Sequence, residues 1–171
     1  MKTLLIMIIF LCSLSFYAQT DDFIGEVNLK SLMSTEQTDW FNKNYKAYTA
    51  NEKKVERIKY LLEKSNYSFQ IFFGAWCSDS KRDIPKMLKI LNLAKVPQAD
   101  YELIGVNEFK DLPKDYQNKA DQIQLNRVPT LIVYKDGKPL NRIVEFPRVS
   151  VIDDLMTILE GKEYKHSYYG K

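Results

Sequence analysis

The chain has 171 residues, of which 45% are hydrophobic and 13% aromatic, enough for one domain with a substantial apolar core and an extension. Its net charge is +3, from 25 basic and 22 acidic residues interspersed along the sequence. A charge this small and this evenly spread does not indicate nucleic-acid binding.

Residues 1–18 differ in character from the rest of the chain. Lys2 gives a positive start, residues 4–16 are almost wholly apolar, and Ala18 is a possible cleavage edge. This pattern predicts a secretory signal peptide and an exported protein, periplasmic or secreted, with no stable membrane insertion after cleavage. An uncleaved membrane anchor is the alternative, since Phe16 stands where a small residue is preferred. The apolar run is, however, shorter than the ~20 residues that a spanning helix needs.

Signal cleavage would decide the cysteine chemistry. Cys12 lies inside the apolar run and follows the bulky residues Phe10 and Leu11, so it is not a typical lipidation site. Cleavage near Ala18 removes Cys12 and leaves Cys77 alone. An exported protein with a single cysteine has no internal disulfide, so the thiol of Cys77 is either reactive or idle.

Residues 19–54 predict a partly helical N-terminal extension. Its first part, residues 19–29, has no clear period and is either a tether or a first edge strand. From Thr35 to Tyr48 aromatic residues recur at spacings near three and four, which predicts a helix. Such a stripe is either core packing, the commoner case, or a surface for a partner.

A second helix is predicted over residues 51–64, with Asn51 as a candidate N-cap and apolar residues on one face. Residues 67–73 then read as a strand that ends in a continuous apolar run. A run of this kind is typical of a central strand covered on both faces.

The stretch around Cys77 follows that strand directly. The apolar run breaks at Gly74, and an amphipathic segment containing Pro85 begins after Ser80. A strand that turns sharply into a helix places Cys77 over the helix N-terminus, where unpaired N–H groups and the helix dipole favour thiolate over thiol. The alternative is an inert buried cysteine that acts as a small hydrophobe.

The remaining elements alternate in type. A strand is predicted over residues 101–106, parallel to the first because the helix between them makes a right-handed crossover. A weakly helical stretch spans residues 111–122, and residues 130–134 form a clear β-run. Asp136-Gly137 predicts a hairpin turn, and residues 143–146 its return strand.

Ser150 is a candidate N-cap of a last helix, which Gly161 ends. Residues 162–171 form a polar tail, which we expect to be loose. The order of elements predicts an α/β fold with a sheet of about four strands covered on both faces.

The combination of motifs resembles the thioredoxin family over residues 55–161. Four features occur in the family's order: Ala75-Trp76-Cys77 after a strand, Pro85 in the next helix, Val128-Pro129-Thr130 before a strand, and the Asp136-Gly137 hairpin before a last helix. The resemblance implies a three-layer sandwich with a central mixed sheet, preceded by the helical extension. It also implies a cis peptide bond at Pro129 that faces Cys77.

Two departures from the family pattern bear on mechanism. The redox-active family has C-x-x-C, whereas this chain has Cys77-Ser78-Asp79-Ser80. Ser80 cannot resolve a mixed disulfide, so a dithiol cycle within one chain is excluded. Family members also often carry a buried acid six residues before the first cysteine, where this chain has Ile71.

By the resemblance, Cys77 is the catalytic nucleophile and Ser80 a candidate donor to its thiolate. Trp76, Val128 and Pro129 would bind an extended substrate, with Val128 pairing through its backbone. Ser80 has an alternative reading as a simple first-turn residue of the helix.

Three basic residues are expected near Cys77. Lys81 and Arg82 directly follow Ser80 in the sequence, and Arg127 precedes the Val128-Pro129 segment that the resemblance places opposite the cysteine. Lys81, Arg82 and Arg127 either offset the charge of Asp79 or bind an acidic group of a substrate. The alternative is an ordinary solvated charged face.

Other chemistries lack the residues they need. His166, the only histidine, lies in the tail, so the sequence predicts no Cys–His pair and no metal site, and no phosphate loop or cofactor is expected. The first hypothesis is monothiol exchange through Cys77 with protein or small-molecule thiols and disulfides. The second is a non-catalytic thioredoxin-fold module that binds an extended peptide.

Overall fold

The computed structural model describes residues 23–34 and 38–170. The predicted signal peptide at residues 1–18 lies outside these ranges. Within them, no helix is both long enough and apolar enough to cross a membrane.

Helices and strands alternate along most of the described chain. The elements are β1 (Gly25–Glu26), α2 (Leu29–Ser34), α3 (Asp39–Ala47), α4 (Glu52–Leu62), β2 (Tyr67–Phe73), α5 (Ser78–Leu93), η4 (Gln98–Asp100), β3 (Tyr101–Gly105), η5 (Lys114–Lys119), α6 (Ala120–Ile123), β4 (Thr130–Lys135), β5 (Lys138–Val144) and α7 (Val151–Leu159).

The strands form one mixed sheet in the order β1-β3-β2-β4-β5. Strands β2 and β3 are parallel, as the crossover predicted, and the other neighbours are antiparallel. The sheet has five strands instead of about four because β1 pairs with the outer edge of β3. Gly25–Glu26, within the segment 19–29, therefore form the edge strand, which was one of the two predicted roles of that segment.

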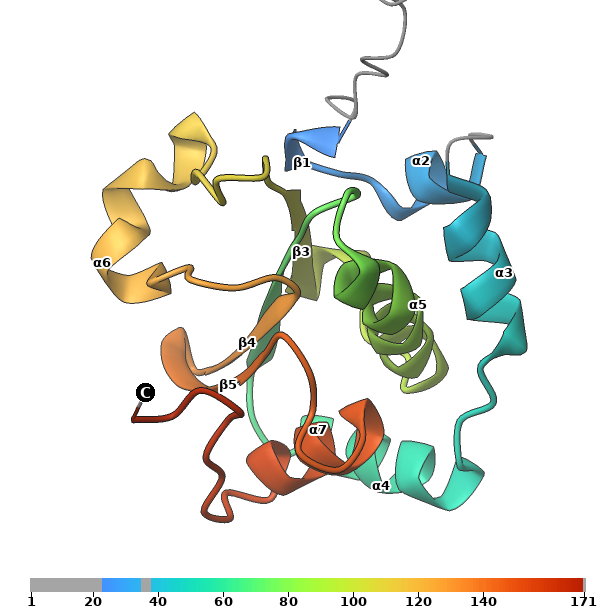
Figure 1. The fold of residues 1–171 in the computed structure, drawn as a ribbon. Helices are drawn as coiled ribbons and strands as arrows, with labels where there is room; N and C mark the ends of the chain where they lie inside the picture. Colours follow the sequence, from blue (N-terminus) through green and yellow to red (C-terminus); the bar gives the residue numbers. More distant parts are fainter. Residues whose placement is uncertain (1–22, 35–37, 171) are drawn as a thin grey trace, which may run out of the picture.

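Each face of the sheet is covered by its own set of helices (Figure 1). Side chains alternate along β2, so Phe69, Ile71 and Phe73 pack against α4, α5 and α7. Phe72 points to the opposite face, where η5 and α6 cover it together with Tyr116 and other apolar residues. The thioredoxin-like sandwich expected from the sequence is thus the fold of the chain.

The N-terminal extension packs into the same core. Helix α3 lies along the outer side of α5 (Figure 1), and Phe41 is fully buried between them and their neighbours. The side chain of Asn44 donates to the carbonyl of Lys81 at 2.9 Å, and Lys89 donates to the carbonyls of Tyr45 and Tyr48. Phe41 of the aromatic stripe is therefore core packing, and Trp40, Tyr45 and Tyr48 pack against the core while staying partly exposed.

The predicted caps are present at two helices. The side chain of Asn51 accepts the N–H of Lys54 at the start of α4, and that of Ser150 accepts the N–H of Asp153 at the start of α7. Each cap provides a partner for one of the N–H groups that a helix leaves unpaired.

Two expectations about the C-terminal part were wrong. The return strand begins at Lys138 and ends at Val144 instead of spanning residues 143–146, because its first residues are exposed and show no apolar alternation. The tail is also not loose. Tyr164 donates to the buried Asp154 carboxylate at 2.7 Å, and Ser167 donates to the carbonyl of Phe146 at 2.7 Å. Asp154 needs hydrogen-bond donors because it is buried, and the tail provides one of them.

Candidate functional site

Cys77 stands at the junction between β2 and α5. It is the N-cap residue of α5, with an extended backbone, and its side chain is partly exposed and in no disulfide. Its N–H donates to the carbonyl of Gly74 at 3.0 Å, and its own carbonyl accepts the N–H of Lys81 at 3.0 Å. The turn and the first helical bonds therefore hold the sulfur at the positive end of the helix, within reach of solvent.

The segment before β4 lies directly opposite the thiol. The Val128–Pro129 peptide bond is cis, and both residues are buried. The Sγ atom of Cys77 donates to the carbonyl of Val128 at 3.4 Å. The arrangement brings together three of the residues that the sequence placed at the site.

Ser80 lies close to this turn, but its bond differs from the one expected. The side chain is fully buried, and its Oγ atom accepts the N–H of Gly74 at 3.2 Å. No hydrogen bond among the described residues joins it to Cys77. The buried N–H of Gly74 needs an acceptor, so the hydroxyl of Ser80 stabilises the turn. Ile71, six residues before Cys77, is fully buried among apolar neighbours.

Trp76 is held beside the turn by a hydrogen bond and by close packing. Its indole N–H donates to the carbonyl of Val106 at 3.1 Å. A Cβ atom built on Gly74 would lie only 2.5 Å from the indole ring, so a larger residue at this position would displace Trp76. Sequence reasoning did not assign a role to Gly74. The signal that indicates one is a glycine two residues before the tryptophan, at the end of a buried strand.

The first turns of α5 carry a network of charged side chains. Arg82 binds Asp79 at 2.5 Å and Asp83 at 2.6 Å, and Lys86 binds Asp83 at 2.8 Å. The hydrogen bond to Asp83 raises the pKa of Arg82, although its partial burial opposes this. Arg82 therefore offsets Asp79, one of its two predicted roles. Sequence reasoning missed Asp83, which is almost wholly buried.

Arg127 lies on the other side of the thiol and is already engaged. Its guanidinium group is 3.5 Å from the carboxylate of Glu145 and 4.7 Å from the ring centroid of Tyr168. The hydroxyl of Tyr168 donates to Glu145 as well, and this bond raises the pKa of Tyr168. Arg127 and Tyr168 line a cavity of about 570 Å³ together with Arg142. The tail thus supplies a partner for Arg127 that the sequence did not reveal.

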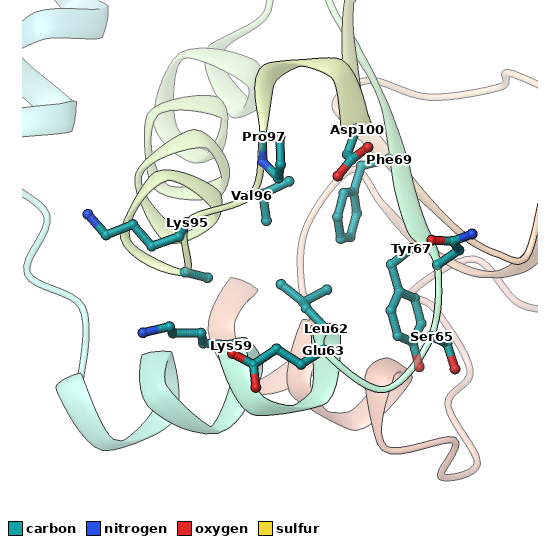
Figure 2. Close-up of a pocket in the computed structure, with 12 residues that line it drawn as sticks. Lys59, Leu62, Glu63, Ser65, Tyr67, Phe69, Lys95, Val96, Pro97 and Asp100 are labelled. Atoms are coloured by element: carbon teal, nitrogen blue, oxygen red, sulfur yellow. The ribbon is translucent and has the colours of Figure 1, made fainter.

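The cavity in Figure 2 lies far from the thiol. It measures about 250 Å³ and is formed where β2 begins and α5 ends, whereas Cys77 lies where β2 ends and α5 begins. Leu62, Phe69 and Val96 form its apolar interior, and the charged side chains of Lys59 and Lys95 extend away from it (Figure 2). Helix α5 has 16 residues and is about 24 Å long, so this cavity takes no part in thiol chemistry.

Comparison with known proteins gives relatives for most of this architecture. A family model described as Thioredoxin matches residues 28–159, which is well over half of the chain. Thioredoxin-1 of Saccharomyces cerevisiae is 29% identical over 73 residues, covering 43% of this chain and 62% of that protein. A thioredoxin of Staphylococcus aureus is 32% identical over 76 residues, covering 44% of this chain and 64% of that protein. The chain therefore spans less than two thirds of either relative.

A solved structure extends the likeness of the fold. A protein of unknown function from Pseudomonas aeruginosa superimposes with a TM-score of 0.57 at 17% identity, covering 85% of this chain and 97% of that one. The family match begins at residue 28 and so includes α2 and α3. The chain belongs to the thioredoxin family.

Proposed function

We propose that this protein is an exported member of its family that carries out monothiol exchange with disulfides through Cys77. The observation that carries the proposal is the position of that thiol. It is partly exposed at the N-terminus of α5, 3.4 Å from the carbonyl of Val128 and next to a cis proline. The membership of the thioredoxin family points to thiol–disulfide chemistry in general.

The reaction has two steps. The thiolate of Cys77 attacks one sulfur of a partner disulfide, the S–S bond breaks, and the second partner sulfur leaves as a thiolate. The product is a mixed disulfide between Cys77 and the partner. Ser80 has no thiol, so it cannot attack this bond. An external thiol therefore resolves it: that thiol forms a new disulfide with one of the two sulfurs and frees the other.

Trp76 and the Val128–Pro129 segment are the proposed substrate-binding residues. Trp76 is fixed by its bond to Val106, and the carbonyl of Val128 already points at the thiol. A partner chain in extended conformation would lie between them, with its cysteine next to Cys77. The proposed partners are proteins or small molecules that carry thiols or disulfides.

The test measures the rate of alkylation of Cys77 as a function of pH, in a Cys12→Ser chain in which Cys77 is the only thiol. The proposal expects the rate to be near its plateau at pH 7, and expects a mixed disulfide with 2-hydroxyethyl disulfide that a Cys77→Ser chain does not form. A Ser80→Cys chain should form the same adduct but lose it quickly, because the introduced thiol resolves it.

The alternative function is a non-catalytic module that binds an extended peptide. Ser80 favours it, because it has no thiol and its hydroxyl is bonded to Gly74 and not to Cys77. The burial of Ile71, in place of an acid, also agrees with it. An alkylation rate that rises only around pH 8.5, as for an ordinary thiol, would decide for this module.

Export is the remaining part of the proposal and rests on residues 1–18. The positive start and apolar run support a signal peptide cut near Ala18. Mass spectrometry of the exported protein should give a chain that lacks this segment. An intact N-terminus in the membrane fraction would instead identify an anchor.

A further inference from the structure

A groove runs between α3 and the first half of α5, beside the thiol. This α3–α5 groove has a volume of about 590 Å³, and its lining includes Trp40, Lys43, Tyr48, Ser78 and Lys81. Ser78 directly follows Cys77 in the chain, so one end of the groove lies at the start of α5, one residue from the cysteine. The two aromatic side chains give it an apolar surface between the lysines.

Four basic residues line the groove, and nearby carboxylates neutralise only two of them. Arg82 and Lys86 line it too, but Asp79 and Asp83 pair with them. Neither lysine of the remaining pair, Lys43 and Lys81, makes an ion pair with any residue in the described part of the chain. Two ammonium groups without an ion-pair partner among the described residues therefore line the groove.

The groove is rigidly placed with respect to the thiol. The side chain of Asn44 donates to the carbonyl of Lys81, which fixes α3 against the first turns of α5. Lys81 lies four residues after Cys77, about 6 Å along the helix axis. An extended chain covers about 3.3 Å per residue, so Lys81 would meet a side chain about two residues from a partner cysteine.

The opposite side of the thiol does not offer the same charge. There Arg127 is paired with Glu145 and stacked on Tyr168, and Arg142 donates to the carbonyls of Gln122 and Ile123. These arginines already have partners within the chain. Lys110 lies over the ring of Trp76, 6.0 Å from its centroid. Lys43 and Lys81 are thus the cations of the α3–α5 groove that remain available to a partner.

We propose that the α3–α5 groove binds an acidic segment of a polypeptide substrate and so selects disulfides flanked by Asp or Glu. The inference rests on the proposed function, and it assigns the substrate class for the same site. Lys43 and Lys81 would bind carboxylates about two residues from the attacked cysteine, while Trp40 and Tyr48 contact an apolar side chain between them. The contribution of the N-terminal extension is to form one wall of this groove.

The test uses two peptides that each carry one cysteine activated as a mixed disulfide with 2-thiopyridine. They differ only at the positions two residues before and after the cysteine, which are Glu in one and Gln in the other. Attack by Cys77 of the reduced Cys12→Ser chain releases thiopyridone, whose absorbance gives the rate constant. The ratio of the two rate constants cancels any change in the reactivity of the thiol itself.

The expected ratio is about tenfold in favour of the Glu peptide at low salt, falling toward one at about 1 M salt. Lys43→Glu with Lys81→Glu should bring the ratio below one, and Lys43→Gln with Lys81→Gln should bring it close to one. The control, Lys53→Glu with Lys59→Glu on α4, changes the net charge equally and should keep the tenfold preference.

Two results would overturn the inference: equal rates for the two peptides, or an equal loss of preference in the α4 control. The uncharged reagent 2,2′-dithiodipyridine separates this failure from that of the proposed function. If Cys77 reacts with the reagent but not selectively with the peptides, only the inference fails. If Cys77 does not react even with the reagent at neutral pH, the proposed exchange function fails.

Discussion

Strand β2 and helix α5 meet in two regions that are stabilised in different ways. One is the apolar end, where β2 begins and α5 ends, and the other is the thiol end, where β2 ends and α5 begins at Cys77. Where β2 begins and α5 ends, Phe69 packs with Leu62 and other apolar residues against the core. At the thiol end, hydrogen bonds add to the apolar packing of Trp76 and Cys77 against Phe72 and Val128. Gly74 donates to Ser80, and Trp76 donates to the carbonyl of Val106.

This difference follows from what the thiol end has to do. A sulfur that reacts with a partner must stay accessible, so apolar packing cannot enclose Cys77 completely, although the residue touches the Phe72–Val128 cluster. Hydrogen bonds depend strongly on direction, and they position the turn while Cys77 stays partly exposed. Stability and reactivity are therefore carried by different residues, and mutations should separate them.

The largest expected effect is at the apolar end. Phe69→Ala should lower the free energy of unfolding by about 3–5 kcal/mol, because it removes a buried ring beside an existing cavity. Urea unfolding measures this loss, and Leu93→Ala on the exposed side of α5 is the control. The alkylation rate of Cys77 in the folded protein should not change. A slower rate would show that the two ends are coupled.

At the thiol end, Ser80→Ala should cost about 1–3 kcal/mol, because it leaves the buried N–H of Gly74 without its acceptor. The same substitution at the exposed Ser78 should cost less than about 0.5 kcal/mol. Here the alkylation rate should change as well, since the turn that holds Cys77 loses a bond. Wild-type stability in the Ser80→Ala chain would contradict this account of the turn.

The contact between α4 and α7 tests a polar bond that lies away from the thiol. The hydrogen bond from Lys54 lowers the pKa of Asp153, with a further contribution from Ser150. A lowered pKa stabilises the fold above about pH 4, the ordinary value, and the effect is lost as the pH falls through the lowered value. Asp153→Asn should therefore cost about 1 kcal/mol at pH 7 and much less at pH 2–3. A loss independent of pH would exclude the ion pair as its cause.

The smallest effect is expected for Arg127→Ala. Its bond to Glu145 is long and half-exposed, and its contact with Tyr168 is at the surface. The loss should stay within about 0.5–1 kcal/mol in urea unfolding. A larger loss would mean that the segment around the cis bond at Pro129 depends on the contact between Arg127 and Tyr168 of the tail for its stability.

Elements that depend on local signals could be predicted from the sequence. Strand β2 has the predicted bounds, Asn51 and Ser150 cap their helices, and Cys77 lies at the start of α5. Apolar runs, cap residues and turn residues act within a few positions of one another, so a single sequence carries this information.

Elements that depend on distant partners could not be predicted in the same way. Strand β1 has two residues and forms only because Gly105 lets the chain at Phe23 approach β3. A Cβ at Gly105 would lie 1.5 Å from the carbonyl oxygen of Phe23. At the site, the bonds of Ser80 and Arg127 were missed for a similar reason. Polar side chains have many possible partners, and only the fold selects one.

The ordered tail also has a consequence for self-association. Strand β5 is an edge strand, and exposed edges can pair with a second chain and start aggregation. Its first half carries Lys138 and Pro139, which oppose such pairing. Beside its second half lies the tail, where Asn141 donates to the carbonyl of Tyr164. A chain shortened at Gly161 should therefore become prone to oligomerise through this edge even if its thiol still reacts.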